Sequence, residues 1–383
     1  MSEKMDFSII IPTWNRSELV DRLLESLYDE RKTYSFGATE VLIIDSSEGR
    51  EKETILSACK KYDATYIHGT DSVRQKRNLG IKSAKYPYII FIDSDVRVKE
   101  GLLDNYASSY QNMPLQFKIG GILGLTVFEG PMTFWWKILS ITPFVDAFSF
   151  AKKYPFHSWT IGNNVSFKKN VLEEIGMFEE NLPYKLGGDD LELSYRVTKA
   201  GYMIGSAPDA VTYHSRNTWN NFSAIIDRAK RWGSMEVMIC TIHPELYKLI
   251  IPKNYVIFCL ALIIGGITCF ITKSWIFLIG LIVWCLSINI VNYVIDGISN
   301  KFKNPIYYLL SKCIAGLYEF FRVKTSIQKK HLDVFLKGML FNSFQIQAQL
   351  KNDAKRMGLL LLSFVLIYTC SFILVLFTKG VVI

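Results

Sequence analysis

Three segments in the last third of the chain carry no charged residue over lengths close to the thickness of a lipid bilayer. They comprise residues 254–272, 274–295 and 357–378, which are 19, 22 and 22 residues long. A helix needs about 20 apolar residues to cross the hydrocarbon core. Buried core helices of this length usually carry some charge, so we predict three transmembrane helices, the first two joined in a hairpin at Lys273.

The charges are divided unevenly along the chain. Residues 1–249 contain 30 Lys and Arg against 31 Asp and Glu, whereas residues 250–383 contain 14 against 4. The loop between the second and third predicted helices, residues 296–356, contains 11 against 4. Because basic loops tend to stay on the cytoplasmic side, we predict a multi-pass protein of the cell membrane. Residues 1–249 then form a cytoplasmic domain and residues 250–383 the membrane region. A basic excess confined to the apolar third favours a membrane as partner and excludes nucleic acid.

Residues 306–321 form a further apolar stretch within the basic loop. The two charged residues of this stretch, Lys312 and Glu319, are seven positions apart and therefore share one face of a helix. This pattern predicts a helix that lies in the membrane interface. A helix that is partly inserted into the membrane remains the alternative.

The first 249 residues alternate short β-rich runs with helical stretches. The predicted strands are residues 7–11, 40–44, 64–68 and 88–92. The predicted helices between them are residues 17–28, 52–61 and 74–84. Near-continuously apolar strands separated by helices indicate an α/β domain with a mostly parallel sheet that is covered on both faces. Ligands of such sheets bind beyond the carboxyl ends of the strands.

Acidic residues follow two of these strands directly. Asp45 ends the second strand, and Asp93 and Asp95 follow the fourth with Ser94 between them. Residues two apart at a strand end project to the same side, so the carboxylates of Asp93 and Asp95 suit a hard divalent cation, which prefers oxygen ligands. The alternative is a simple strand-to-turn stop, because Asp and Ser favour turns.

Six ordered segments of this region resemble the family 2 glycosyltransferases, whose catalytic domain has the Rossmann-like GT-A fold. The segments are IIIPTWNR at 9–16, VLIIDSS at 41–47, RQKRNLGIKSA at 74–84, YIIFIDSDV at 88–96, GNNVSFKK at 162–169 and GGDDLELSYR at 187–196. The resemblance spans roughly residues 6–220. It implies a metal-dependent enzyme that transfers a sugar from a nucleotide-sugar donor with inversion at the anomeric carbon.

The resemblance also implies which residues hold the donor and the metal. The expected nucleotide-binding residues are Pro12, Thr13, Arg16, Asp45, Arg77, Asn78, Asp93 and Ser94. Mn²⁺ or Mg²⁺ would be bound by Asp93, Asp95 and the late histidine His214. Some alternatives stay open, because Arg16 could be a solvated charge at a helix start, Asp45 a turn cap and His214 a structural residue. We expect Arg74 and Lys76 to be surface charges.

The catalytic and acceptor residues are expected later in the chain. By resemblance, Asp190 is the general base that takes a proton from the attacking hydroxyl, with Asp189 beside it where the family usually has Glu. Two adjacent carboxylates can raise one another's pKa, which favours a base active near neutral pH. An aspartate before a helix could also be only an N-cap. Asn163 and Asn164 resemble an acceptor or donor-sugar loop, with a Gly-Asn turn as the alternative.

Two further segments point toward the acceptor or the membrane. Arg231 and Trp232 end a sequence similar to the QxxRW motif of processive synthases, with Arg228 in place of Gln. We interpret them as contacts near the acceptor, with an amphipathic helix on the lipid headgroups as the alternative. Residues 128–159 contain three Trp and six Phe. They are either a flap that meets a lipid-linked substrate or ordinary helical packing.

Together these patterns predict a membrane-anchored inverting glycosyltransferase. The donor would be a UDP-, GDP- or dTDP-linked sugar, and the acceptor a hydroxyl of a lipid-linked molecule or a polysaccharide. The first alternative is a polyprenyl-phosphate glycosyltransferase, whose acceptor phosphate needs no base. A processive polysaccharide synthase is less favoured, because three spans make a thin wall for a polymer channel. A catalytically silent membrane binding protein is also less favoured, since both carboxylate pairs are present.

Overall fold

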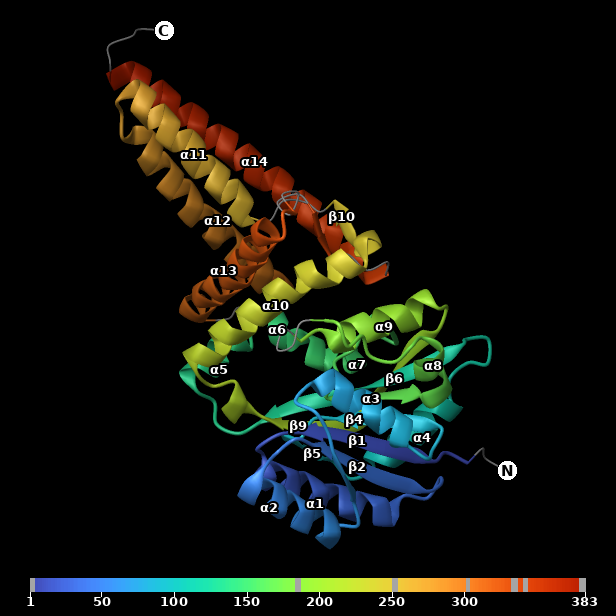
Figure 1. The fold of residues 1–383 in the computed structure, drawn as a ribbon. Helices are drawn as coiled ribbons and strands as arrows, with labels where there is room; N and C mark the ends of the chain where they lie inside the picture. Colours follow the sequence, from blue (N-terminus) through green and yellow to red (C-terminus); the bar gives the residue numbers. More distant parts are fainter. Residues whose placement is uncertain are drawn as a thin grey trace. The chain divides into compact units, whose positions relative to one another are not determined.

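The computed structural model describes residues 4–182, 187–249, 254–300, 304–331, 337–339 and 344–378. The chain divides into two compact units, Met1–Trp232 and Gly233–Ile383. The division falls inside helix α10 (Phe222–Ile242), whereas the sequence analysis places it after residue 249. Figure 1 shows the elements of both units.

A nine-stranded sheet forms the centre of the first unit. Its strands run in the order β3-β2-β1-β4-β8-β6-β9-β5, and β7 pairs with β9. Their bounds are β1 Phe7–Thr13, β2 Thr39–Asp45, β3 Thr65–His68, β4 Tyr88–Ile92, β5 Val96–Val98, β6 Ile119–Glu129, β7 Phe156–His157, β8 Asn164–Lys168 and β9 Met203–Ser215. The pairs formed by β1 to β4 are parallel, while β8 runs antiparallel to both β4 and β6. The predicted mostly parallel α/β sheet is confirmed.

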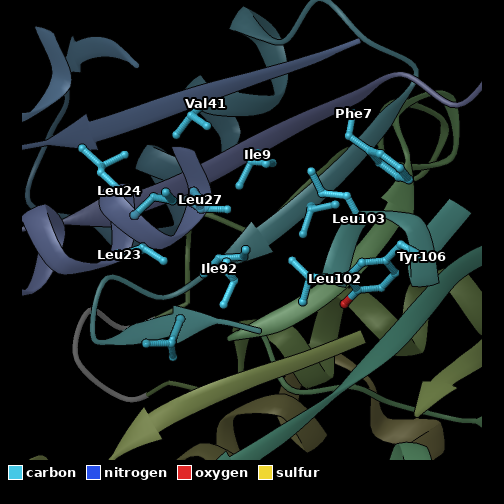
Figure 2. Packing of buried hydrophobic residues seen from close by; sticks show 14 of the residues in the cluster. Phe7, Ile9, Leu23, Leu24, Leu27, Val41, Ile92, Leu102, Leu103 and Tyr106 are labelled. Carbon is cyan, nitrogen blue, oxygen red and sulfur yellow. The ribbon is translucent and has the colours of Figure 1, made fainter. Parts of the chain in front are cut away.

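Helices cover both faces of this sheet. Their bounds are α1 Ser17–Thr33, α2 Gly49–Lys61, α3 Val73–Ser83, α4 Leu102–Gln111, α5 Phe134–Leu139, α6 Pro143–Asp146, α7 Phe150–Lys153, α8 Lys169–Glu174 and α9 Asp189–Lys199. Alternate residues of β1 enter different cores, because successive side chains of a strand point to opposite faces. Ile9 and Ile11 pack with α1, α2 and α4, whereas Ile10 packs with α3, α8 and α9. Figure 2 shows part of the first core, where Ile9 and Phe7 lie near Leu27 and Leu103.

The second unit exposes many large apolar side chains, although Trp284, Phe277 and Leu281 are buried within it. Its helices are α11 Asn254–Thr272, α12 Ile276–Asn300, α13 Pro305–Gln328 and α14 Phe344–Thr378, and β10 (Tyr247–Leu249) pairs antiparallel with β11 (Lys337–Met339). Phe270 is 86% exposed, whereas Arg322 is only 1% exposed. The buried Arg322 pairs with Glu319 at 2.7 Å on the same helix.

Among the described residues, one apolar helical segment is long enough to cross a membrane. It is Ile276–Val294 within α12. The apolar segments Ala261–Thr272 and Leu361–Phe377 are shorter. All three predicted spans fall on helices, but a multi-pass arrangement stays a prediction.

Helix α3 approaches the sheet closely at Gly80. A Cβ atom at this position would lie 2.5 Å from Cγ2 of Ile10, which is buried in β1. The missing side chain lets α3 lie directly on β1. This contact sets the height of the N-terminal turn of α3 above the carboxyl ends of the strands.

We expect Gly80→Ala to lower the free energy of unfolding by about 1–3 kcal/mol, because the new methyl group overpacks the core. The better helix propensity of Ala, about 1 kcal/mol, offsets only part of this loss. Urea denaturation of the full-length protein in lipid nanodiscs measures the change. The control is Ser83→Ala on the exposed side of the same helix, which should stay within about 0.5 kcal/mol of the wild type. Equal stability of both variants would contradict the close packing at Gly80.

Candidate active site

The parallel strands bring the first group of predicted residues to one edge of the sheet. Thr13 and Asp45 are register partners at the ends of β1 and β2. Asp93 follows the end of the neighbouring strand β4, and its backbone N–H donates to the carbonyl oxygen of Asn163 at 3.4 Å. The strand ends therefore gather predicted nucleotide-binding and acceptor residues at one place.

Asp45 is fully buried and firmly held. Its Oδ1 accepts hydrogen bonds from the backbone and the hydroxyl of Ser47, at 3.1 and 2.6 Å, and its Oδ2 accepts one from the Tyr66 hydroxyl at 3.1 Å. Thr13 is its register partner on β1 and Ser46 follows it in the chain, and the hydroxyl oxygens of both are buried with no hydrogen-bond partner among the described residues. Unpaired buried hydroxyls are costly, so these two are suited to meet a ligand.

Asp95 and His214 come together although they are far apart in the sequence. Pairing of β5 with β9 sets Val96 opposite His214, and Asp95 Oδ1 lies 3.4 Å from His214 Nε2. The second oxygen of Asp95 lies 3.2 Å from Arg16, which also donates to the hydroxyl of Ser94 at 3.3 Å. Two of the three predicted metal ligands are thus adjacent.

The donor set of Asp95 and His214 fits a cation. His214 Nδ1 lies 2.9 Å from the carbonyl oxygen of Ser215, so this nitrogen carries the proton and donates it. In the neutral imidazole, the lone pair of Nε2 then faces the carboxylate of Asp95. A carboxylate oxygen and an imidazole nitrogen at this distance can share a proton or bind a common divalent ion, so their chemistry fits a metal site.

The third predicted ligand, Asp93, is turned toward Arg77. Its Oδ1 accepts a hydrogen bond from Arg77 Nη2 at 3.2 Å. Burial raises the pKa of Asp93, an effect that Arg77 opposes and Asp95 reinforces. In the described part of the chain, no three His, Cys, Asp or Glu residues are gathered closely enough to hold a metal ion. Of the three predicted metal ligands, Asp95 and His214 thus lie next to each other, and metal binding stays a prediction.

Arg77 joins three segments of the site. Its Nη1 donates to Asp189, while its Nη2 donates to Asp93 and, at 3.3 Å, to the carbonyl oxygen of Gly162. Burial by itself lowers the pKa of Arg77, but the carboxylates of Asp189, Asp93 and Asp190 outweigh it, so the net pKa is raised. Arg77 was predicted to bind the nucleotide, and that role stays a prediction.

Asp190 is presented by the first turn of α9. The helix begins after Gly188, whose φ of +75° is in the left-handed region, so a glycine and not an aspartate occupies the N-cap position. Asp190 accepts backbone hydrogen bonds from Gly162 and Leu191, both at 2.9 Å. Burial and the neighbouring Asp189 raise the pKa of Asp190 to about 6, against the lowering effect of Arg77 and these two hydrogen bonds.

The expectation that Arg74 and Lys76 are surface charges is wrong. The residues are only 4% and 2% exposed. Arg74 donates to the carbonyl oxygen of Leu182 at 2.6 Å, and Lys76 donates to that of Thr13. Burial lowers the pKa of Lys76. Both residues are buried because the N-terminal turn of α3 faces the strand ends.

The three predicted asparagines differ in what they leave free. Asn78 bonds the backbone of Phe178 in both directions, at 2.9 and 3.0 Å. Asn164 is fully buried and uses both N–H groups on the carbonyls of Leu125 and Ala210, while its oxygen accepts from Tyr106. Of these three, Asn163 keeps a buried amide nitrogen that has no hydrogen-bond partner in the described part of the chain.

An aromatic wall surrounds His214. The ring centroids of Phe128, Phe148 and Trp219 lie 5.1, 6.3 and 6.1 Å from that of the imidazole. Part of the aromatic segment 128–159 therefore packs inside the domain. The sequence analysis did not single out Trp219, although its position five residues after His214 was a usable signal.

Of the two predicted acceptor contacts on α10, Trp232 packs against the aromatic rings near His214. Arg231 pairs with Asp227 at 3.0 Å, one helical turn earlier. The ring of Trp232 lies 5.9 Å from that of Trp219 and 5.1 Å from that of Phe144. The guanidinium of Arg228 lies 3.9 Å above the Trp219 ring. Aromatic packing thus connects the predicted acceptor residue Trp232 to the surroundings of His214.

Comparisons with protein families agree with this arrangement. The chain matches glycosyl transferase family 2 over residues 8–161 and glycosyl transferase family group 2 over residues 88–298. The second match covers more than half of the chain. The protein is a family 2 glycosyltransferase. It transfers a sugar from a nucleotide-sugar donor.

Individual relatives are distant from this glycosyltransferase. It is 27% identical to chondroitin synthase of Pasteurella multocida over 56% of its own length, but spans only 25% of that protein. It is 24% identical to a dolichyl N-acetyl-α-D-glucosaminyl phosphate 3-β-D-2,3-diacetamido-2,3-dideoxy-β-D-glucuronosyltransferase of Methanococcus voltae, over 69% of its length and 83% of the relative.

A solved structure supports the fold. A mannosyltransferase of Pyrobaculum calidifontis, in complex with GDP-Man and Mn²⁺, aligns with a TM-score of 0.51 and 15% identity. The alignment covers 87% of this glycosyltransferase and 86% of the mannosyltransferase. The predicted GT-A fold is confirmed.

We expect Asn164→Leu to lower the free energy of unfolding by about 2–5 kcal/mol, because it leaves two buried carbonyls and the Tyr106 hydroxyl unpaired. Tyr106→Phe removes only one of these bonds and should cost about 1 kcal/mol. Urea denaturation compares the two variants with the wild type. If Asn164→Leu were as stable as the wild type and only bound acceptor more weakly, Asn164 would be an acceptor contact and not a structural residue.

Proposed function

We propose that this enzyme is a membrane-anchored, inverting, metal-dependent glycosyltransferase that uses a hydroxyl acceptor. The observation that carries the proposal is the junction at Arg77, through which Asp93 on the donor side is linked to the Asp189-Asp190 pair on α9. A donor-side carboxylate and a candidate base thus belong to one polar cluster. A single displacement between two such sides would invert the anomeric carbon.

Asp190 is the proposed general base. A pKa of about 6 leaves its carboxylate mostly ionised at neutral pH, yet basic enough to accept the proton of an acceptor hydroxyl. Its two backbone hydrogen bonds fix the carboxylate at the start of α9. A phosphate acceptor would not need a base, because it is already anionic near neutral pH. The position of Asp190 therefore favours a hydroxyl acceptor over a polyprenyl phosphate.

Asp95 and His214 are the proposed ligands of Mn²⁺ or Mg²⁺, and Asp93 lies two residues before Asp95 in the chain. When bound, such an ion offsets the negative charge that develops on the leaving nucleoside diphosphate. Arg16 lies against Asp95 and is 41% exposed at its side chain, so it can contact the diphosphate as well. Electrostatic stabilisation of this kind is usually the largest single contribution to catalysis.

The nucleotide is proposed to lie over the ends of β1 and β2. Asp45 is held by Ser47 and Tyr66 in one orientation, which suits the recognition of an N–H group on a base. The unpaired hydroxyls of Thr13 and Ser46 add two further polar groups. Pro12 precedes Thr13 at the end of β1, and Asp93 and Ser94 follow the end of the neighbouring parallel strand β4.

The second unit is proposed to anchor the enzyme in a membrane, with the catalytic unit in the cytoplasm. Support comes from the exposed apolar side chains of α11, α12 and α14, among them Ile267, Phe270, Leu286 and Phe377. The Methanococcus voltae relative is named for an acceptor sugar linked through phosphate to dolichol, and it is matched over most of its length. A lipid-linked acceptor fits both observations, with Asn163, Arg231 and Trp232 as its proposed contacts.

We expect one nucleotide sugar among UDP-, GDP- and dTDP-linked donors to raise the unfolding temperature by several degrees, and only with Mn²⁺ or Mg²⁺. A ligand at 100 times its Kd adds about 2.7 kcal/mol of stability. Thermal shift assays with metal and with EDTA measure the effect, and Asp95→Asn should abolish its metal-dependent part. An equal rise in EDTA would contradict the metal proposal, and no rise with any donor would contradict the donor site.

We expect Asp190→Asn to lower kcat by about 10²–10⁴-fold with a hydroxyl acceptor while the KM for the donor changes little. In the wild type, the rate should fall as the pH drops through about 6, because protonated Asp190 cannot accept a proton. Initial rates between pH 4.5 and 8 measure both effects, with Asp209→Asn at an exposed position as the control. Undiminished turnover of Asp190→Asn on a polyprenyl phosphate would favour the alternative acceptor.

A further inference from the structure

One face of α3 bonds the backbone of Phe178 and Leu182, which precede the proposed base Asp190 in the chain. Arg74, Arg77 and Asn78 are spaced i, i+3 and i+4, so they share a helix face. Arg74 donates to the carbonyl of Leu182, Asn78 bonds the backbone of Phe178, and Arg77 donates to Asp189. Helices α3 and α9 pack in the same hydrophobic core (Figure 1). A basic helix start that could bind phosphate is instead engaged with protein groups.

The contacts of Arg77 keep its guanidinium in place. Asp93, Gly162 and Asp189 come from three different segments, and the rigid fork of a guanidinium bonds all three. The guanidinium carbon lies 5.3 Å from the ring centroid of Phe178. Reaching out to a diphosphate would break these contacts and leave Asp189 buried and uncompensated, which is strongly unfavourable.

Gly162 completes a link between Arg77 and Asp190. Its carbonyl oxygen accepts from Arg77, and its N–H donates to Asp190 Oδ2 at 2.9 Å. A Cβ atom at this position would lie 2.8 Å from Arg77 Nη2. Only a residue without a side chain lets the guanidinium and the Asp190 carboxylate bond the same peptide segment.

The two carboxylates of the pair therefore differ in their surroundings. Asp189 is buried in an ion pair with Arg77. Asp190 accepts two backbone hydrogen bonds and forms no ion pair with any described residue. Among the residues that the structure describes, the charged groups that act on Asp190 are Asp189 on its own helix and Arg77 from α3.

We propose that Arg77 is a positioning residue that assigns the role of base to Asp190, because it engages Asp189 in an ion pair and fixes the start of α9 to Asp93 and Gly162. This inference rests on the proposed function, in which Asp190 is the base. It replaces the role of nucleotide ligand that the sequence predicts for Arg77. Removing Arg77 would let Asp189 and Asp190 compete for one proton.

The test is a titration of the Asp190 side chain by NMR, in full-length protein with ¹³C-labelled aspartate in lipid nanodiscs. Asp190→Asn identifies the signal. In Arg77→Met the midpoint should rise by about 1–3 pH units, because Asp189 then acts on Asp190 without compensation. In Asp189→Asn it should fall below the wild-type value, and in the double variant it should lie between the two. Unchanged midpoints in Arg77→Met and Asp189→Asn would overturn the proposal.

Two further variants separate positioning from general damage. Arg74→Met removes another buried arginine from the same helix face and should leave the midpoint of Asp190 unchanged. Arg77→Lys keeps the charge without the fork, so the midpoint should stay near the wild-type value while kcat falls and the KM for the donor is preserved. If Arg77→Met does not fold, Arg77→Lys decides the proposal, because a positioning residue predicts a fall in kcat with the KM for the donor preserved, and an unchanged kcat would overturn it.

Calorimetry with UDP and GDP in the presence of Mn²⁺ distinguishes the two roles of Arg77. A positioning residue predicts that Arg77→Lys and Arg77→Met bind the nucleotide within about threefold of the wild-type Kd. A loss of tenfold or more with an unchanged Asp190 midpoint would make Arg77 a nucleotide ligand and overturn the proposal. If the wild type bound neither nucleotide, the proposed donor site would fail, while the titration would still decide the role of Arg77.

Discussion

A buried guanidinium must be paired with hydrogen-bond acceptors, and the site of this enzyme is built around the buried Arg77. Arg77 is withdrawn from water, so its charge needs anionic or carbonyl partners at fixed positions. The chain supplies Asp93 after β4, Gly162 before β8 and Asp189 at the start of α9. Segments more than 100 residues apart in the sequence are held together by this one side chain, because losing any partner leaves a buried charge uncompensated.

Aromatic rings surround the second group of site residues, at His214. Phe128, Phe148 and Trp219 surround the imidazole of His214, which leaves its Nε2 facing Asp95. Apolar walls exclude water, and electrostatic interactions between the remaining polar groups are stronger in such an environment. The site thus combines a polar junction at Arg77 with aromatic packing around His214.

The strand ends were predictable from the sequence because buried parallel strands are recognisable as short apolar runs. Asp45, Asp93 and Asp95 follow such runs, and the structure has β2 and β4 where they were expected. The burial of Arg74 and Lys76 was not predictable, because a basic helix start has the same sequence pattern whether it faces water or protein carbonyls. The contacts of Asn164 depend on the antiparallel strand β8 and its neighbours, whose long-range pairing leaves no local pattern. Length and charge identified the apolar helices, but not how many of them span a membrane.

The exposed apolar side chains of the second unit have a consequence for handling the protein. Its outer surface carries Phe270, Ile271 and Phe377, while Arg322 and Glu319 are inside. In buffer without detergent such exposed apolar surfaces associate with one another, so the protein would aggregate. Surfactant or added phospholipid would be required from the moment of cell lysis for the catalytic unit to be recovered in an active, monodisperse preparation.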